Sequence, residues 1–176
     1  MRITAIAALL LACSALPAQA EDAFRLTSPD IAEGRMLAPA QVMDGFGCAG
    51  GNQAPTLGWE HAPKGTQSFA LTLYDPDAPT GSGWWHWVVY DIPADTKGLS
   101  GAALPQGAKA GRNDYGSTGF GGACPPPGAM HRYRFTLTAL DVAKLELPDD
   151  ASPALIGFMT GAHALASATI TAVFTR

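Results

Sequence analysis

The sequence predicts a mostly β protein. Its apolar segments are short, rich in β-branched and aromatic residues, and bounded by glycine, proline or aspartate, which is the pattern of a sheet protein. In the clearest segment, 68–74, strict alternation places Phe69, Leu71 and Leu73 on one face. We expect further strands at 85–92, 131–140 and 168–174, and a short one at 57–59.

One helix is predicted before the last strand. Ser152 suits the N-cap and Pro153 the first turn. Apolar residues then recur at helical spacing, namely Leu155, Phe158, Met159, Ala162 and Leu165. A shorter helical turn is possible at 141–145. Residues 102–127 show no sustained periodicity, and we expect a long, ordered and functional loop there.

The first twenty residues have the features of a secretory signal peptide. Met1-Arg2 is followed by an apolar run and by the small-residue cleavage site Ala18-Gln19-Ala20. An alternative is a lipoprotein signal with its cysteine at Cys13. We therefore expect a periplasmic or secreted protein, cleaved near Ala20, with one domain over 21–176.

Composition argues against two kinds of partner. The formal charge is −4, or −5 once Arg2 is removed, and no basic run is present, so nucleic-acid binding is not expected. After Glu21 no apolar stretch reaches the roughly 18 residues of a transmembrane helix, so we expect no transmembrane segment.

Two cysteines, Cys48 and Cys124, remain after such processing, and both lie in glycine-rich sequence. In an oxidising compartment a disulfide between them is the expected state. Two free buried thiols are the alternative.

Three clusters could carry chemistry. The first, Tyr74-Asp75-Pro76-Asp77-Ala78-Pro79, follows a strand, and its prolines stiffen a turn that carries two carboxylates. An ordinary turn in which the carboxylates cap backbone N–H groups is the plainer interpretation.

The second cluster embeds His86 among three tryptophans, where a buried structural histidine is the alternative to a binding role. The third is the Gly-Pro loop 119–127, followed by His131-Arg132-Tyr133. Strand alternation puts His131 and Tyr133 on one face, at the end of an apolar stripe. Glycines in the loop could bring backbone N–H groups close to an oxyanion.

Together these clusters resemble the phosphatidylethanolamine-binding protein family, and within it the exported members of the bacterial Raf kinase inhibitor-like branch. The resemblance runs from about Phe24 to the C-terminus and includes Gly45-Phe46-Gly47-Cys48 and Asp114-Tyr115-Gly116. It implies a β-sandwich-like fold, a large antiparallel sheet packed on a smaller one, with an anion pocket at one end.

By motif, the resemblance implies a ligand-binding set of Asp75, His86, Gly122, Cys124, Pro125, His131 and Tyr133. Cys124 stands where some family members have glycine, which puts close backbone approach there in doubt. Eukaryotic members also line the pocket with an aromatic residue from a C-terminal helix. This sequence ends at Arg176 without that helix, which suggests a more open pocket.

A small anionic ligand, a phosphate or a phosphoethanolamine-type head group, would suit two imidazoles facing one carboxylate. The carboxylate favours protonated imidazole, so the net charge of the site is tunable near neutral pH. We expect His86 and His131 to donate to ligand oxygens, and Tyr133 and loop N–H groups to complete the site. Asp75 would orient an imidazole or accept from an ammonium group.

The sequence also bears on three other functions. A hydrolase is not expected, because no Gly-x-Ser-x-Gly motif is present and an oxidised Cys124 is no nucleophile. A metal site at Asp75, Asp77, His86 and His131 lacks supporting ligand spacing, and no cofactor is expected. Inhibition of a protein partner such as a peptidase or kinase is the main alternative to binding a small ligand.

Overall fold

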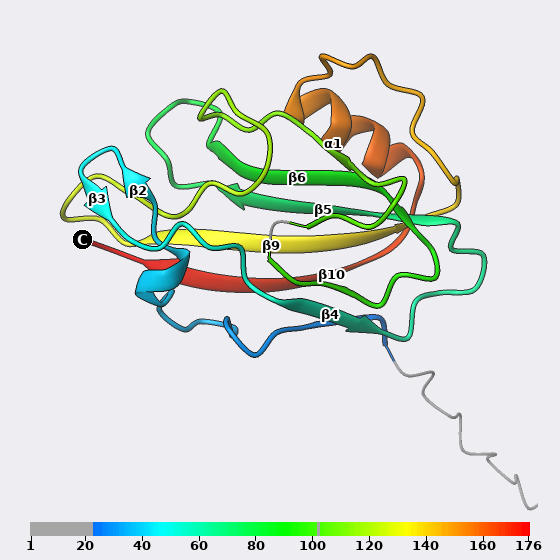
Figure 1. Cartoon of the computed structure of the whole chain (residues 1–176), viewed down its shortest axis with the longest axis horizontal. Coiled ribbons are helices and arrows are strands. Elements are labelled where there is room, and N and C mark those ends of the chain that lie inside the picture. The colour runs from blue at the N-terminus through cyan, green and yellow to red at the C-terminus, as the bar shows by residue number, and fades with distance from the viewer. Residues whose placement is uncertain (1–22, 102) are drawn as a thin grey trace, which may run out of the picture.

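The computed structural model describes residues 23–101 and 103–176, and its largest element is a five-stranded antiparallel sheet (Figure 1). Residues 1–20, where a signal peptide or a lipoprotein signal at Cys13 is expected, lie outside the described residues. The strands run in the order β10-β9-β5-β6-β8, with bounds β5 Ser68–Asp75, β6 Trp84–Pro93, β8 Lys109–Ala110, β9 His131–Leu140 and β10 Ala164–Phe174. The prediction of a mostly β fold is confirmed.

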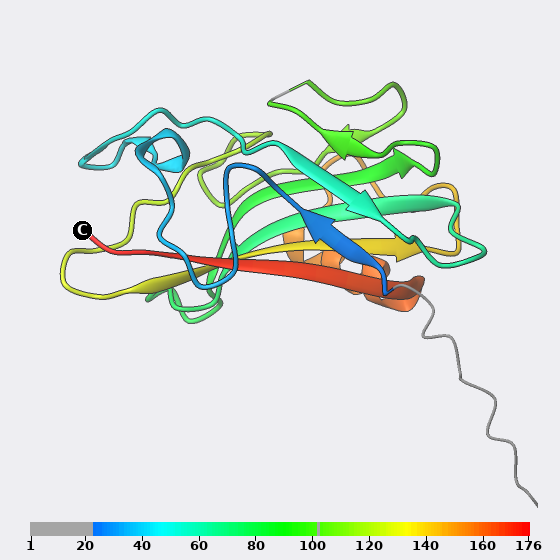
Figure 2. The same cartoon turned by 90° about the horizontal axis from the view of Figure 1, so that it is seen from below.

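A smaller antiparallel sheet lies across one face of the large one (Figure 2). It contains β1 (Arg25–Thr27), β4 (Leu57–Glu60) and β7 (Gly98–Leu99). A separate two-stranded ribbon, β2 (Asp44–Gly45) and β3 (Cys48–Ala49), follows the short 3-10 helix Pro39–Gln41.

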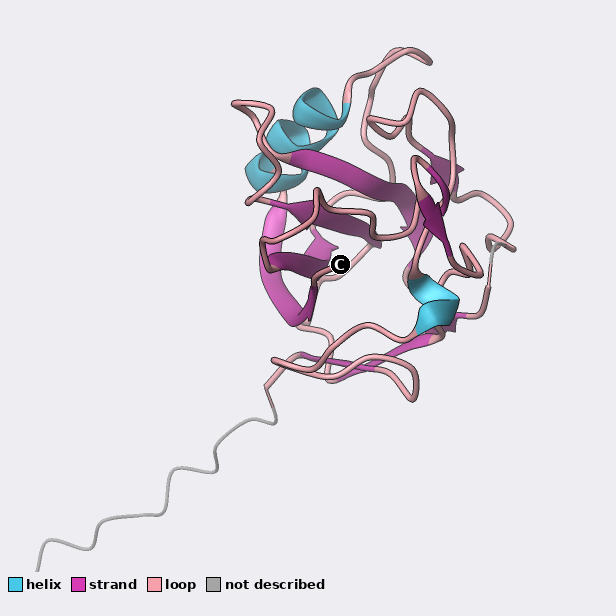
Figure 3. Cartoon of the chain, turned by 90° about the vertical axis from the view of Figure 1, so that its left-hand side faces the viewer, coloured by secondary structure: helices cyan, strands magenta, loops and turns pink. Residues whose placement is uncertain are grey.

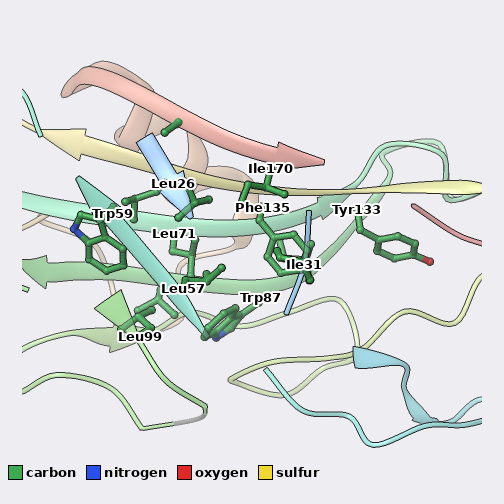
Figure 4. Close-up of a cluster of buried hydrophobic side chains, with 14 of the residues drawn as sticks. Leu26, Ile31, Leu57, Trp59, Leu71, Trp87, Leu99, Tyr133, Phe135 and Ile170 are labelled. Carbon is green, nitrogen blue, oxygen red and sulfur yellow. The ribbon is translucent and has the colours of Figure 1, made fainter. Parts of the chain in front are cut away.

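The main core fills the space between the two sheets. Alternation on β5 and β9 turns Phe69, Leu71 and Phe135 toward the small sheet, where Leu57 and Trp59 meet them. Tyr133 lies at one end of this cluster, and its phenol oxygen points away from the other labelled side chains (Figure 4). The apolar stripe of β9 therefore leads directly from the core to polar groups at one end of the sheet.

The opposite face of the large sheet is covered by α1 (Pro153–Ala162), as Figure 3 shows. The predicted cap is confirmed, since the Ser152 side chain accepts a hydrogen bond from the Leu155 N–H at 3.2 Å. Of the predicted apolar face, only Met159 packs against the core beneath the helix. Ile156 is the buried apolar side chain, whereas Phe158 is 72% exposed. The helix is short, and only the face that carries Ile156 and Thr160 packs against the sheet.

Strand bounds agree with the sequence-based ranges to within one residue except at β10, which begins at Ala164 instead of 168. Its early residues pair with the end of β9, and Leu165 therefore belongs to a strand and not to the helix. No helical turn forms at 141–145. There the Leu145 N–H donates at 2.8 Å to Oδ1 of Asp91, a buried residue with φ of +55° that interrupts the regular pairing of β5 with β6.

The predicted long loop also contains β8, which adds an edge strand to the large sheet. Within residues 23–101 and 103–176, no helix has the length and apolar character needed to cross a membrane.

Candidate functional site

A cavity of about 220 Å³ lies at the end of the large sheet where β5 ends and β6 and β9 begin. The ribbon β2–β3 and the C-terminus lie at the same end, on the left in Figure 1. Six of the seven predicted residues line it, all except Gly122. The full lining is Phe46, Asp75, Ala78, Pro79, Thr80, Trp84, His86, Tyr115, Cys124, Pro125, Pro126, His131 and Tyr133.

Asp75 and His131 form a buried pair in the cavity wall. The His131 Nδ1 lies 2.7 Å from Oδ2 of Asp75, and because an ionised carboxylate only accepts, this nitrogen carries the proton. The other carboxylate oxygen accepts the Asp77 N–H at 2.8 Å. Asp75 thus orients the His131 ring, one of the two roles expected for it.

Asp77 lies outside the cavity and fixes the turn that carries Asp75. Its carboxylate accepts hydrogen bonds from Nε and Nη2 of Arg132 at 2.9 and 2.7 Å. It also accepts one from the backbone N–H of Arg132 at 2.9 Å. These hydrogen bonds from Arg132 lower the pKa of Asp77 to about 2. Its oxygens are therefore committed to the guanidinium, and among the described residues no group of three or more His, Cys, Asp or Glu side chains is placed to hold a metal ion.

His86 presents a hydrogen-bond acceptor to its surroundings. Its Nδ1 lies 2.9 Å from the carbonyl oxygen of Gly121, which can only accept, so Nδ1 carries a proton. Burial lowers the pKa of His86 below its ordinary value. The neutral ring then has a lone pair on Nε2, a buried atom with no hydrogen-bond partner. This differs from the expectation that His86 donates to a ligand.

Two buried donors accompany it in the cavity wall. The phenol oxygen of Tyr133 and Nε1 of Trp84 are both buried without a partner. Burial raises the pKa of Tyr133 well above its ordinary value, so its hydroxyl keeps its proton. The Tyr115 hydroxyl is already engaged, since it donates to the Gly122 carbonyl at 2.9 Å. Buried polar atoms normally have partners. Of the seven buried side-chain atoms without one in the described residues, these three, on Trp84, His86 and Tyr133, belong to residues that line the cavity.

The amides of residues 121–123 do not supply N–H groups to the cavity, which differs from the expectation for the glycine loop. The amides of Gly121, Gly122 and Ala123 donate to the His86 carbonyl, the Asn52 side chain and the Gln41 carbonyl. A Cβ on Gly122 would lie 2.5 Å from the Met43 nitrogen. Glycine is needed there because the loop packs closely on the preceding chain, and not because a ligand approaches it.

The predicted disulfide is confirmed. Cys48 and Cys124 form a disulfide, with 6.0 Å between their Cα atoms. It joins the β2–β3 ribbon covalently to the Gly-Pro loop 119–127, which is called the cavity loop below. Phe46, at the tip of the ribbon with φ of +53°, is 69% exposed and packs on Tyr115 at 5.2 Å between ring centroids. Phe46 and Tyr115 were not among the predicted site residues, although the Cys48–Cys124 pairing could have placed Phe46 beside the loop.

Arg176, at the C-terminus, joins two parts of the cavity rim. Its Nε donates to the Pro125 carbonyl at 2.6 Å and its Nη1 to the Gly47 carbonyl at 2.9 Å. The last residue of the chain therefore helps to position both the loop and the ribbon.

The structure is a two-sheet protein of the β-sandwich class, with a cavity that contains a buried Asp–His pair and unpaired polar atoms. The sequence profile of the phosphatidylethanolamine-binding protein family matches residues 27–175. The chain belongs to this family, and membership supports a ligand-binding function.

Similar proteins have been described in several organisms. UPF0098 protein YbcL of Escherichia coli (strain K12) is 49% identical over 97% of both chains, and UPF0098 protein YbhB of the same strain is 49% identical over 85% of this chain and 99% of its own. The crystal structure of E. coli YbcL, described as a new member of the mammalian PEBP family, superposes with a TM-score of 0.84 over 87% of this chain and 98% of its own. The putative lipoprotein LppC of Mycobacterium tuberculosis is 39% identical over 77% of this chain and 64% of its own length.

Proposed function

We propose that the cavity binds the oxyanion of a small phosphate-bearing molecule, such as a phosphoethanolamine-type head group. The observation that carries the proposal is the set of unpaired buried polar atoms, His86 Nε2 and the Tyr133 hydroxyl, beside the Asp75–His131 pair. Leaving such atoms unpaired costs about 1–3 kcal/mol each, and a ligand that bonds them recovers that cost. The cavity volume of about 220 Å³ fits a head group better than a drug-sized molecule.

In this proposal Tyr133 donates to a ligand oxygen. A protonated His131 would neutralise Asp75 and donate a second, charge-assisted hydrogen bond through its Nε2. The exposed rim, with Phe46, Pro79 and Pro126, contacts the carbon part of the ligand. Polar groups therefore lie at the floor and apolar groups at the mouth, which suits a molecule with a charged end and an apolar stem.

We further propose that the cavity binds its ligand without turnover. The Cys124 sulfur is held in a disulfide, which removes the one thiol of the cavity as a nucleophile. The amides of 121–123 are committed elsewhere, so these three N–H groups are not available to stabilise an oxyanion transition state.

Export to the periplasm or beyond is part of the proposal. It is supported by the features of residues 1–20, by the Cys48–Cys124 disulfide, which is typical of oxidising compartments, and by the name of the LppC relative. N-terminal mass spectrometry of the protein from its host would distinguish cleavage near Ala20 from lipidation at Cys13.

Isothermal calorimetry with phosphoethanolamine, inorganic phosphate and acetate tests the binding proposal. We expect the two phosphates to bind more tightly than acetate, and Tyr133→Phe to weaken phosphate binding about tenfold, since it removes one hydrogen bond and little else. His86→Ala should weaken it as well. His163→Ala, which changes a histidine at the C-cap of α1 outside the cavity, is the control. Equal, weak binding by the wild type and all three variants would refute the site assignment.

A further inference from the structure

The hydrogen bonds of His86 restrict which oxyanion the cavity accepts. The Gly121 carbonyl holds a proton on Nδ1, so the neutral ring offers Nε2 only as an acceptor. No donor of the protein reaches this atom, although the Tyr133 and Tyr115 rings lie within 5.2 and 5.6 Å of the imidazole, between centroids. A fully ionised oxyanion has only acceptors, and its oxygen facing Nε2 would meet a lone pair.

We propose, on the basis of the binding function above, that the cavity selects an oxyanion that carries its own proton. The ligand class is the singly protonated phosphate monoester, and its P–OH donates to Nε2 of His86. The remaining oxygens accept from the Tyr133 hydroxyl and from Nε2 of the His131 ring, which carries a proton on both nitrogens as the proposed function requires. A phosphodiester, including the phosphodiester of an intact phospholipid, has no such proton and is a poor ligand.

Protonation of His86 is the competing way to satisfy a fully ionised ligand, and the surroundings oppose it. The titratable groups around the ring are Asp75 on β5, His131 and Tyr133 on β9, and Asp114 and Tyr115 in the 111–122 loop. The two carboxylates favour the imidazolium, but burial outweighs them and keeps the pKa of His86 below its ordinary value. A proton supplied by the ligand avoids placing a charge on a buried ring.

Three probes separate the proton from the charge. Methyl phosphate near pH 6 is about half monoanion with one P–OH, whereas dimethyl phosphate and methyl sulfate are monoanions without one. We expect methyl phosphate to bind at least about tenfold more tightly than either. Because a monoester with a second pKa near 6 is only about 1% singly protonated at pH 8, ionisation of the ligand alone should lower its affinity about 50-fold between pH 6 and pH 8.

Nitrogen NMR of histidine in the wild-type complex needs no variant. We expect Nε2 of His86 to remain an unprotonated, hydrogen-bonded nitrogen when methyl phosphate is bound. An imidazolium His86 in the complex, or methyl sulfate and dimethyl phosphate binding as tightly as methyl phosphate, would overturn the inference and leave the binding function intact. Failure of all three probes to bind between pH 5 and pH 8 would instead overturn the binding function.

A variant adds a second test. In His86→Gln the amide can turn its NH₂ toward the ligand, so the preference for methyl phosphate over methyl sulfate should shrink to less than about threefold. His163→Gln, which introduces the same change at the C-cap of α1, is the matched control and should keep the full preference. Full preference retained in His86→Gln would overturn the assignment of the proton to Nε2.

Discussion

Arg132 controls the position of Asp75 without touching the ligand cavity. It holds Asp77 by two side-chain bonds and one backbone bond, and the Asp77 N–H in turn binds Asp75. The turn between β5 and β6 is thereby attached to the start of β9, so the buried carboxylate faces His131 in one fixed orientation.

This interaction predicts a specific pH dependence of stability. The folded-state pKa of Asp77, about 2, lies below its ordinary value of 3.8, so the ionised carboxylate stabilises the fold above that value. The contribution is lost as pH falls from about 4 to about 2. We expect Arg132→Met to lower the free energy of unfolding at pH 6 and to match the wild type near pH 2.

Urea denaturation at a series of pH values measures this difference. Arg134→Met, two residues further along the same exposed face of β9, is the control and should show no such convergence. A deficit of Arg132→Met that persists unchanged to pH 2 would contradict the account.

Single residues also show what sequence can and cannot predict about the site. Strand alternation predicted that His131 and Tyr133 share a face, and the family resemblance implied that Asp75 joins them in the pocket. The acceptor character of His86 was not predictable, because it depends on the Gly121 carbonyl, 35 positions away, and Gly122 was misassigned because its packing partner lies in 41–43.

At the scale of elements, the end of β10 shapes the cavity rim. Arg176 follows β10 and binds carbonyls of the loop and of the ribbon, so two segments distant in sequence share one side chain.

Replacement of Arg176 should therefore loosen the rim while leaving the core intact. In Arg176→Met we expect faster amide hydrogen exchange at 45–48 and 124–128, and weaker binding of methyl phosphate by a few-fold, because hydrogen bonds to charged groups contribute about 1.5–3 kcal/mol. Arg35→Met, on an exposed segment, serves as the comparison. Exchange rates that do not change in these two segments would exclude a bracing role for Arg176.

Elements with strong alternation were predicted within one residue, whereas α1 and β10 were less well predicted. A helical period identifies a helix but not which side meets the sheet, and so Leu155 and Phe158 were placed on the wrong face. The start of β10 is rich in alanine and serine, which have weak strand preference, and pairing with β9 overrides it.

At the scale of the whole molecule, the Cys48–Cys124 bond joins segments 76 residues apart. Closing so long a loop restricts the unfolded chain far more than the folded one. The bond also crosses from the β2–β3 ribbon to the cavity loop, so it links global stability to the geometry of the site.

Removal of this disulfide should destabilise the protein by about 2–4 kcal/mol. Urea denaturation of the Cys48→Ser/Cys124→Ser double variant measures the loss, and reduction of the wild type should reproduce it. Two free thiols in the denatured, unreduced wild type, or equal stability of the oxidised and reduced protein, would contradict the pairing.

The layered architecture followed from the sequence because amphipathic strands must bury one face and the motifs resemble a known family. The assembly of the site from distant segments could not be predicted from the sequence in the same way. Its wall combines β5, β6, β9, the 115–126 loop and the ribbon, and only the three-dimensional pairing of strands brings these together.

A crystal structure of the protein with bound methyl phosphate tests the central claim most directly. We predict the phosphate in the cavity between Asp75, His86 and His131, with one oxygen within about 3 Å of the Tyr133 hydroxyl and another within about 3 Å of His86 Nε2. Phosphate bound only elsewhere on the surface, with both of these atoms still unpaired, would contradict the account.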